Sequence, residues 1–272
     1  MSLKLLFDPT DKIKSYLEKF YELIHSYHEV NLLKINPDKT QLMFVSKPKY
    51  KPLTKHLTFK AKSYEIKPVS CLKVLGSLIS HDLDNEREIS QLIPLLNYRI
   101  NQFEKLKSYT DFKTRLQFAN SFIIGRMTYM MPTYTNLSCH QKDRLHKVLM
   151  QTARMALNSY CLGKSIEFIL SKYNWVDINE MIKLLSLKFI NNLLLWQKPG
   201  NLYYKLKLNG RSCADISFQA HSFPKSSRLK STLLYKGIKY YNQLPGDIKY
   251  LPKKKFKSKL KTERQMLEQL SG

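Results

Sequence analysis

The stretch LKVLGSLISHDLDNEREISQLIPLLNYRINQFEKL, residues Leu72 to Leu106, contains a change of hydrophobic period. Up to Ile79 the apolar residues cluster around Gly76, which is typical of short strands with a bulge or a close backbone approach at the glycine. Beyond Leu83 the apolar residues recur every three or four positions, the period of an amphipathic helix. That helical stripe consists of Ile89, Ile93, Leu96, Ile100, Phe103 and Leu106. The sequence therefore predicts a small sheet followed by a helical domain.

Upstream of this stretch, the sequence predicts one helix and several short strands. The helix covers residues 10–30, and its apolar face consists of Ile13, Leu17, Phe20, Ile24 and Tyr27. The strands are predicted at 41–45, 57–61 and 63–67, separated by turn-forming residues.

Downstream, two further helices have recognisable starts. Ser138 is a candidate N-cap for a helix that ends near Leu157, and Asp177 with Glu180 resembles a capping box that opens a helix through Trp196. The predicted fold class is α+β, with a small β-hairpin region and predominantly α-helical middle and C-terminal regions. We expect three segments, residues 1–82, 83–200 and 201–272.

Charge is the most unusual property of the chain. It has 46 Lys and Arg residues against 21 Asp and Glu residues, a formal net charge of +25 over 272 residues. Dispersed cations of this number favour a polyanionic partner, and nucleic acid (RNA, DNA or a hybrid) is the first candidate because phosphate neutralisation releases counterions. No apolar run approaches the about 20 residues that a membrane helix needs, so we predict no membrane association and a nuclear or cytoplasmic location.

Metal binding and redox chemistry have little support in the sequence. The four cysteines are scattered and form no C-x-x-C pair, and no glycine-rich phosphate loop occurs. Asp82 and Asp84 are close together, but their position after the predicted strands indicates a turn and a helix cap. We therefore predict no metal site and no cofactor within this chain.

Three separated motifs carry a resemblance to a known family. They are NLLKINPDKTQLMF (Asn31–Phe44), VLGSLISHDL (Val74–Leu83), and YKGIKYYNQLPGDIK (Tyr235–Lys249) followed by FKSKL (Phe256–Leu260). Together, in this order and over nearly the whole chain, they resemble the late palm, thumb and tail of the reverse transcriptases of non-LTR retrotransposons, in particular jockey-like elements. Tyr241 stands where that family usually has tryptophan.

The resemblance assigns each of the three segments to a different part of the polymerase. Residues 1–82 would be the C-terminal part of the palm with a primer-grip-like hairpin, residues 83–200 a thumb-like helical domain, and residues 201–272 a basic C-terminal segment. The intact family performs RNA-directed DNA synthesis with magnesium, held by an aromatic-Ala-Asp-Asp block that this sequence lacks. We therefore expect a fragment that binds nucleic acid, is inactive alone, and has the missing fingers and palm as a further partner.

The resemblance also assigns roles to three residues near the N-terminal end. Lys39 would contact the phosphates of an incoming nucleotide, with a surface lysine in a turn as the alternative. Leu75 and Gly76 would form the primer grip, with ordinary strand packing as the alternative.

Basic residues supply the remaining candidate contacts with nucleic acid. Lysine and arginine bind phosphates, and tyrosines interleaved with them stack on unpaired bases. The thumb-like candidates are Arg115, Arg126, Lys142, Arg144, Lys147 and Arg154. The C-terminal candidates are Lys236, Lys239, Tyr240, Tyr241, Lys253, Lys254, Lys255, Lys257 and Lys259, and for the last five a solvated tail or a nuclear-import signal is the alternative. Phe256 and Leu260, four residues apart, are predicted to pack.

Two other functions remain open from the sequence. One is a basic adaptor or structural protein that binds a protein partner or an anionic surface. The other is an inactive relic of a mobile element.

Overall fold

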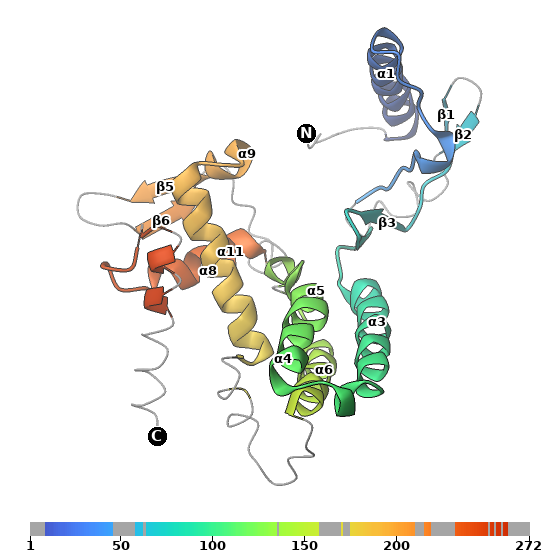
Figure 1. Ribbon diagram of the computed structural model, residues 1–272. Coiled ribbons are helices and arrows are strands. Elements are labelled where there is room, and N and C mark those ends of the chain that lie inside the picture. The colour runs from blue at the N-terminus through green and yellow to red at the C-terminus, as the bar shows by residue number, and fades with distance from the viewer. Residues whose placement is uncertain are drawn as a thin grey trace. The chain divides into compact units, whose positions relative to one another are not determined.

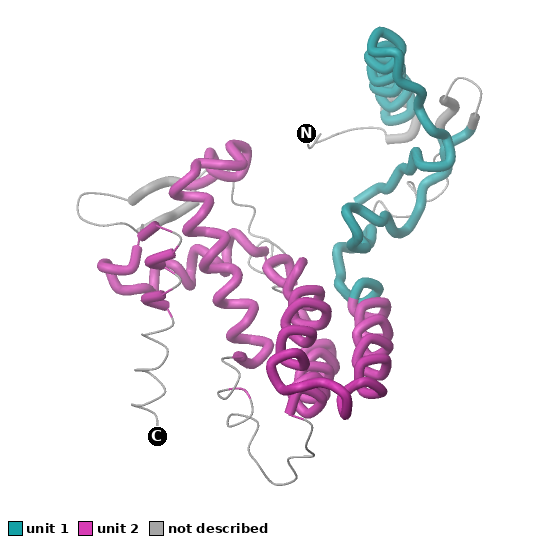
Figure 2. Tube along the Cα trace, viewed as in Figure 1, with its two compact units in different colours: residues 1–88 teal, residues 89–272 magenta. Residues whose placement is uncertain are grey.

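A computed structural model describes residues 9–45, 58–61, 64–134, 136–157, 170, 175–209, 215–218, 232–249, 251–252, 254–256 and 258–260. The described chain is mostly helical with small antiparallel two-stranded sheets (Figure 1). It divides into two compact units, residues 1–88 and residues 89–272 (Figure 2). The predicted α+β class is confirmed.

Unit 1 combines one long helix with two hairpins. Its elements are α1 (Pro9–Val30), the 3-10 turn η1 (Pro37–Lys39), β1 (Phe59–Ala61), β2 (Tyr64–Ile66), β3 (Cys71–Val74) and β4 (Ser77–Ser80). Of the predicted strand at 41–45, only a single parallel bridge between Leu42 and Pro68 is present. The small core consists of Tyr21 and Ile66, with Leu17, Ile35 and Leu42 packed against them.

The face of α1 that packs matches the predicted one only in part. Leu17 of the predicted face contacts the core of unit 1 together with Tyr21, which was not predicted, whereas Phe20 and Tyr27 are exposed. The apolar surface of the helix is wide enough to include both sets, and the strand of Ile66 covers only one side of it.

The hairpin β3–β4 turns at Leu75 and Gly76. Val74 pairs with Ser77 across a two-residue turn, and both turn residues have positive φ, 48° at Leu75 and 86° at Gly76. Two positive φ values are the signature of the tight turn that matches strand twist. Gly76 therefore forms the turn itself, in place of the bulge or close backbone approach expected there.

The start of helix α3 (Glu86–Glu104) is attached to this hairpin. The carboxylate of Glu88 accepts a hydrogen bond from the backbone N–H of Leu78 at 2.7 Å, and Arg87 donates to the Ser70 hydroxyl at 2.8 Å. Asp84 accepts from the backbone N–H of Glu86 at 3.1 Å, as the cap prediction requires.

Unit 2 contains the remaining elements. They are the rest of α3, η3 (Lys107–Tyr109), α4 (Phe112–Phe118), the π-helix η4 (Ala119–Ile124), α5 (Gly125–Thr128), η5 (Met131–Thr133), α6 (Cys139–Leu157), α8 (Ile178–Trp196), α9 (Gly200–Tyr203), β5 (Leu206–Asn209), β6 (Asp215–Phe218) and α11 (Leu233–Asn242). The predicted caps are confirmed. Asp177 accepts from two backbone N–H groups of α8, and Ser138 and Gln141 cap α6 reciprocally.

The first core of unit 2 lies between α3, the α4–α5 helix, α6 and the start of α8 (Figure 1). Ile89, Leu96, Ile100 and Phe103 are buried in it, which confirms most of the predicted stripe. Leu106 is exposed because α3 ends at Glu104, two residues before it.

A second core joins α8 to the C-terminal segment. It contains Ile190 of α8, Tyr241 of α11, and Ile248, Phe256 and Leu260 beyond α11. The packing prediction for Phe256 and Leu260 is confirmed. The expected boundary after residue 200 falls within this core, so the basic segment packs on the helix that precedes it.

Candidate nucleic-acid interface

Helix α6 presents two of the predicted cations on its exposed face. Lys147 and Arg154 are seven residues apart, which places them on the same side of the helix, two turns or about 10 Å apart along its axis. The opposite side carries Leu145, Leu149 and Ala156, all fully buried. The orientation of the two cations is therefore fixed by the core beneath them.

The fold brings Lys142 of α6 close to Lys236 of α11. Partial burial lowers the pKa of Lys236 below the usual lysine value, and the positive charge of Lys142 lowers this pKa further. These residues come from the two separate candidate sets, which lie 94 positions apart in the sequence. One cation of the thumb-like set and one of the C-terminal set thus lie close together in unit 2.

Helix α8 adds a cation that the sequence analysis missed. The ammonium group of Lys183 lies 5.9 Å from the ring centroid of Tyr240, within cation–π range. Tyr240 is half-buried and its neighbour Lys239 is exposed. The buried neighbours of Lys183, Met181 and Ile182, were the available signal, because on an amphipathic helix they turn residue 183 outward.

We use the name basic cluster for the surface cations of these three helices, of which Lys142 and Lys236 are the pair that lies close together. It consists of Lys142, Lys147 and Arg154 on α6, Lys183 on α8, and Lys236 and Lys239 on α11.

Arg126 and Arg144 have local partners in the same unit. The guanidinium of Arg126 lies 5.6 Å from the ring centroid of Tyr129, and Arg144 donates to the Ser90 hydroxyl at 3.4 Å. Both side chains are half-buried at the surface.

Tyr241 has a structural role, which excludes the predicted stacking on bases. Its side chain is 0% exposed, and its ring stacks on Phe256. The hydroxyl donates to the amide oxygen of Asn191 at 3.5 Å, and the amide nitrogen of Asn191 donates to the carbonyl of Leu251 at 3.0 Å. This aromatic residue therefore holds the tail against α8.

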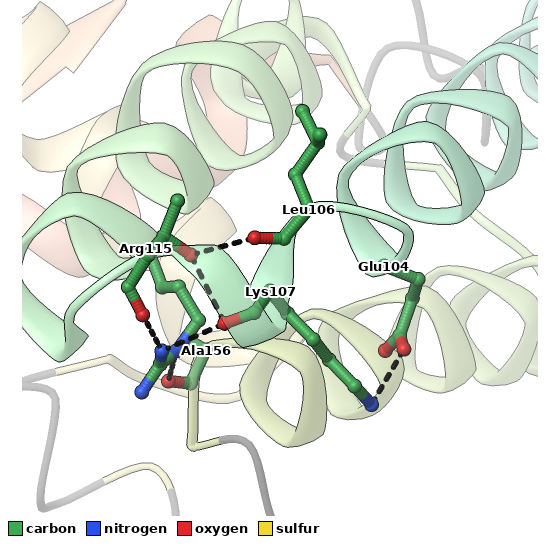
Figure 3. Close-up of polar contacts among 6 residues, drawn as sticks. Glu104, Leu106, Lys107, Arg115 and Ala156 are labelled. Atoms are coloured by element: carbon green, nitrogen blue, oxygen red, sulfur yellow. Dashed lines mark hydrogen bonds and ion pairs between the residues drawn. The ribbon is translucent and has the colours of Figure 1, made fainter.

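Arg115 is also structural, in contrast to its predicted contact with phosphate. It is 8% exposed, and its guanidinium donates to the carbonyl oxygens of Ala156, Lys107 and Thr110 (Figure 3). Ala156 lies in the last turn of α6, where the carbonyls carry the negative end of the helix dipole. The charge of Arg115 is thus satisfied inside the protein.

The C-terminal lysines divide into three groups. Lys254 and Lys255 are exposed, whereas Lys259 forms an ion pair with Asp247 that lowers the pKa of the carboxyl. Lys253 and Lys257 lie outside the described residues.

The candidates of unit 1 lie in two different turns. Lys39 is exposed in the η1 turn, where the side chain of Asn36 accepts from the backbone N–H groups of Asp38 and Lys39 at 2.9 and 3.3 Å. Leu75 is 86% exposed at the hairpin tip, and Gly76 follows it. Ordinary strand packing does not account for a leucine in that position.

In the described part of the chain, no cluster of three or more His, Cys, Asp or Glu side chains is arranged to hold a metal ion. None of the helices described is long and apolar enough to cross a membrane.

Comparison with models of protein families, with curated proteins and with solved structures gave no match.

Proposed function

We propose that this chain binds nucleic acid, either an RNA:DNA hybrid or a single strand. In this proposal it is the thumb and tail of a reverse transcriptase of the non-LTR type. The polymerase chemistry itself needs carboxylates that hold two metal ions. The sequence has no adjacent aspartates, so the proposed role of this chain is binding, and the magnesium belongs to the intact family enzyme.

The observation that carries the proposal is the basic cluster. Three helices that are far apart in the sequence each contribute cations to it, and the packing of α6 and α8 orients them outward. Partial burial lowers the pKa of Lys236, and Lys142 lies close enough to repel its charge and lower this pKa further. A phosphate group beside them would relieve that repulsion, which favours binding of a polyanion.

A salt titration tests the proposal directly. Binding of a labelled RNA:DNA hybrid to the full chain is measured by fluorescence anisotropy between 50 and 200 mM salt, a range where about six phosphate contacts change affinity about a thousandfold. The double variant Lys147→Gln/Arg154→Gln should reduce the slope of log affinity against log salt by about 1.5 to 2, because two phosphate contacts are lost.

The matched control removes two charges elsewhere in unit 2. Lys105→Gln/Lys205→Gln alters two exposed lysines outside the basic cluster and should leave the slope near the wild-type value. Wild-type affinity that does not change with salt would reject the proposal. Equal slopes for the two double variants would reject the assignment to α6.

A second function, protein binding, is favoured by α1. Tyr16, Phe20, Leu23, Tyr27 and Val30 are exposed at spacings of four, three, four and three, the seam spacing of a coiled coil. The first half of the helix carries Lys12, Lys14 and Lys19 against Asp11 and Glu18, and the second half carries Glu22 and Glu29 without Lys or Arg. This polarity favours a second copy in antiparallel orientation.

Sedimentation of the full chain tests that second function. A dimer that Leu23→Glu converts to a monomer would support it, with Glu18→Gln as a control on the polar side of α1. A wild-type chain that stays monomeric would reject it.

A further inference from the structure

The helix formed by α4, η4 and α5 carries exposed aromatic rings that the basic cluster does not include. The backbone remains helical from Phe112 to Thr128, with a π-helical segment in the middle. Phe122 is 53% exposed and Tyr129 is 51% exposed. Both values are high for large aromatic side chains, which are usually buried for most of their area.

The rings lie next to guanidinium groups. Arg126 is four residues after Phe122 on this helix, and its guanidinium lies 5.6 Å from the centroid of Tyr129. Arg99 of α3 donates to the backbone carbonyl of Phe122 at 2.5 Å, so a second guanidinium lies against the same turn. We call Arg99, Phe122, Arg126 and Tyr129 the aromatic platform.

Contacts with the first core hold the aromatic platform in place. The ring of Phe122 stacks on Phe118 at 5.0 Å between centroids, and Phe118 stacks on Phe103 of the first core at 3.9 Å. The indole N–H of Trp175 donates to the side chain of Asn120 at 2.9 Å within the π-helical segment. These contacts fix the exposed ring of Phe122 before any ligand arrives.

The positive charge around the aromatic platform favours an anionic ligand. The sequence has no Asp or Glu from Phe112 to Lys142, and none from Ile89 to Phe103 on α3. A surface with two guanidiniums and no carboxylate in its own segments favours an anion. Phe118 stacks on one face of Phe122 and Arg126 lies over one face of Tyr129, and the remaining exposed area of the two rings favours a flat unsaturated group. Unpaired nucleotides combine both properties.

We propose that the aromatic platform binds unpaired nucleotides of single-stranded nucleic acid, with bases stacked on Phe122 and Tyr129 and phosphates beside Arg99 and Arg126. The inference rests on the proposed nucleic-acid function and adds a preference for single strands at a second surface. A duplex keeps its bases stacked inside, so it cannot use the rings in this way.

Leucine substitutions separate stacking from apolar contact. Phe122→Leu and Tyr129→Leu keep a large apolar side chain but remove the π-face. Affinity of the full chain for a labelled 12-nucleotide oligo(dT) is compared with its affinity for a 12-base-pair duplex. Each variant should lose about fivefold or more in single-strand affinity, the low end of what one stacked base contributes, and less than twofold in duplex affinity.

The matched control is Tyr109→Leu. Tyr109 is 86% exposed in η3, outside the platform, and its replacement should leave both affinities unchanged. Thermal melting followed by circular dichroism checks that all three variants fold, and Tyr129→Leu gives an independent answer if Phe122→Leu disturbs the Phe118 stack.

The outcomes distinguish the two proposals. Folded leucine variants that bind oligo(dT) as tightly as the wild type would overturn the platform and leave the basic cluster unaffected. Loss of duplex and single-strand affinity to the same degree would also overturn it. A wild-type chain that binds neither nucleic acid at low salt would overturn the proposed function together with this inference.

Discussion

Gly237 of α11 packs so closely on Ile190 of α8 that a Cβ atom at Gly237 would lie 2.8 Å from Cγ1 and 3.2 Å from Cδ1 of Ile190. Ile190 is fully buried, so it has no free space into which to move. The close approach of the two helices therefore depends on the missing side chain.

Gly237→Ala should destabilise the protein. Overpacking of this kind costs about 1–3 kcal/mol, and the better helix propensity of alanine offsets about 1 kcal/mol of it. Chemical denaturation measures the free energy of unfolding. Gly246→Ala is the control, because no atom lies within 4 Å of a Cβ placed there, and equal stability of the two variants would contradict the packing argument.

Replacement of Arg115 should affect stability and leave the salt dependence of binding unchanged. Arg115→Met leaves the carbonyls of Lys107, Thr110 and Ala156 without their shared donor, and we expect a loss of about 3 kcal/mol. Arg115→Lys should be intermediate, since one ammonium group cannot reproduce the planar fork. A stable Arg115→Met variant with a reduced salt slope would instead assign Arg115 to the phosphate-binding surface.

A residue that favours positive φ should stabilise the turn of the β3–β4 hairpin when it replaces Leu75. Leucine at positive φ is strained by about 1–2 kcal/mol, whereas Asn-Gly is the favoured pair for such turns. Leu75→Asn should therefore raise the stability of the hairpin by about 1 kcal/mol, measured as slower amide hydrogen exchange in β3 and β4. Gly76→Ala, at φ 86°, should have the opposite effect, and faster exchange in Leu75→Asn would contradict the turn geometry.

The lowered pKa of Lys236 predicts a measurable pH dependence. Since burial and Lys142 disfavour its charged form, Lys236 loses its proton at a lower pH than an ordinary lysine. The folded state therefore binds fewer protons than the unfolded state as pH approaches 10.5, and the contribution of this group to stability rises with pH through its folded pKa.

Acetylation of Lys236 in the folded chain requires the neutral amine, so its rate rises with the deprotonated fraction of this group. Mass spectrometry of the acetylated peptide across pH should give a midpoint below the usual lysine value. Lys142→Gln should raise that midpoint, because the repelling charge is gone. Lys147→Gln, also on α6, should leave it in place, and identical shifts in both variants would show that the two lysines do not interact specifically.

Local sequence signals predicted where the helices begin and which of their faces are apolar better than they predicted which other segments cover each side chain. The caps at Ser138 and Asp177 and most of the α3 stripe were predictable because they depend on neighbours a few residues away. The burial of Arg115 was not, because its acceptor on Ala156 is 41 positions further along the chain. A periodic pattern marks such a residue as basic on a helix and carries no information about the helix that covers it.

For the candidate site as well, the sequence predicted which residues face outward on one helix and did not predict the contacts between helices. Lys147 and Arg154 face outward as the helical period requires, whereas Tyr241 looked like a stacking residue and is the centre of the second core. The motif YYNQLP thus contains one tyrosine for packing and one beside a cation. Only the crossing of α11 over α8 determines which is which.

The anchoring of Phe256 and Leu260 under α8 changes how the lysines around them behave as a polycation. A free tail would search for phosphates as a fluctuating chain and lose conformational entropy at each one. Because Phe256 and Leu260 are docked, Lys254 and Lys255 have already lost much of that entropy on folding, so their charges act from near-constant positions. Shortening the protein before Phe256 would therefore remove an ordered charged surface and uncover the apolar underside of α8 with it.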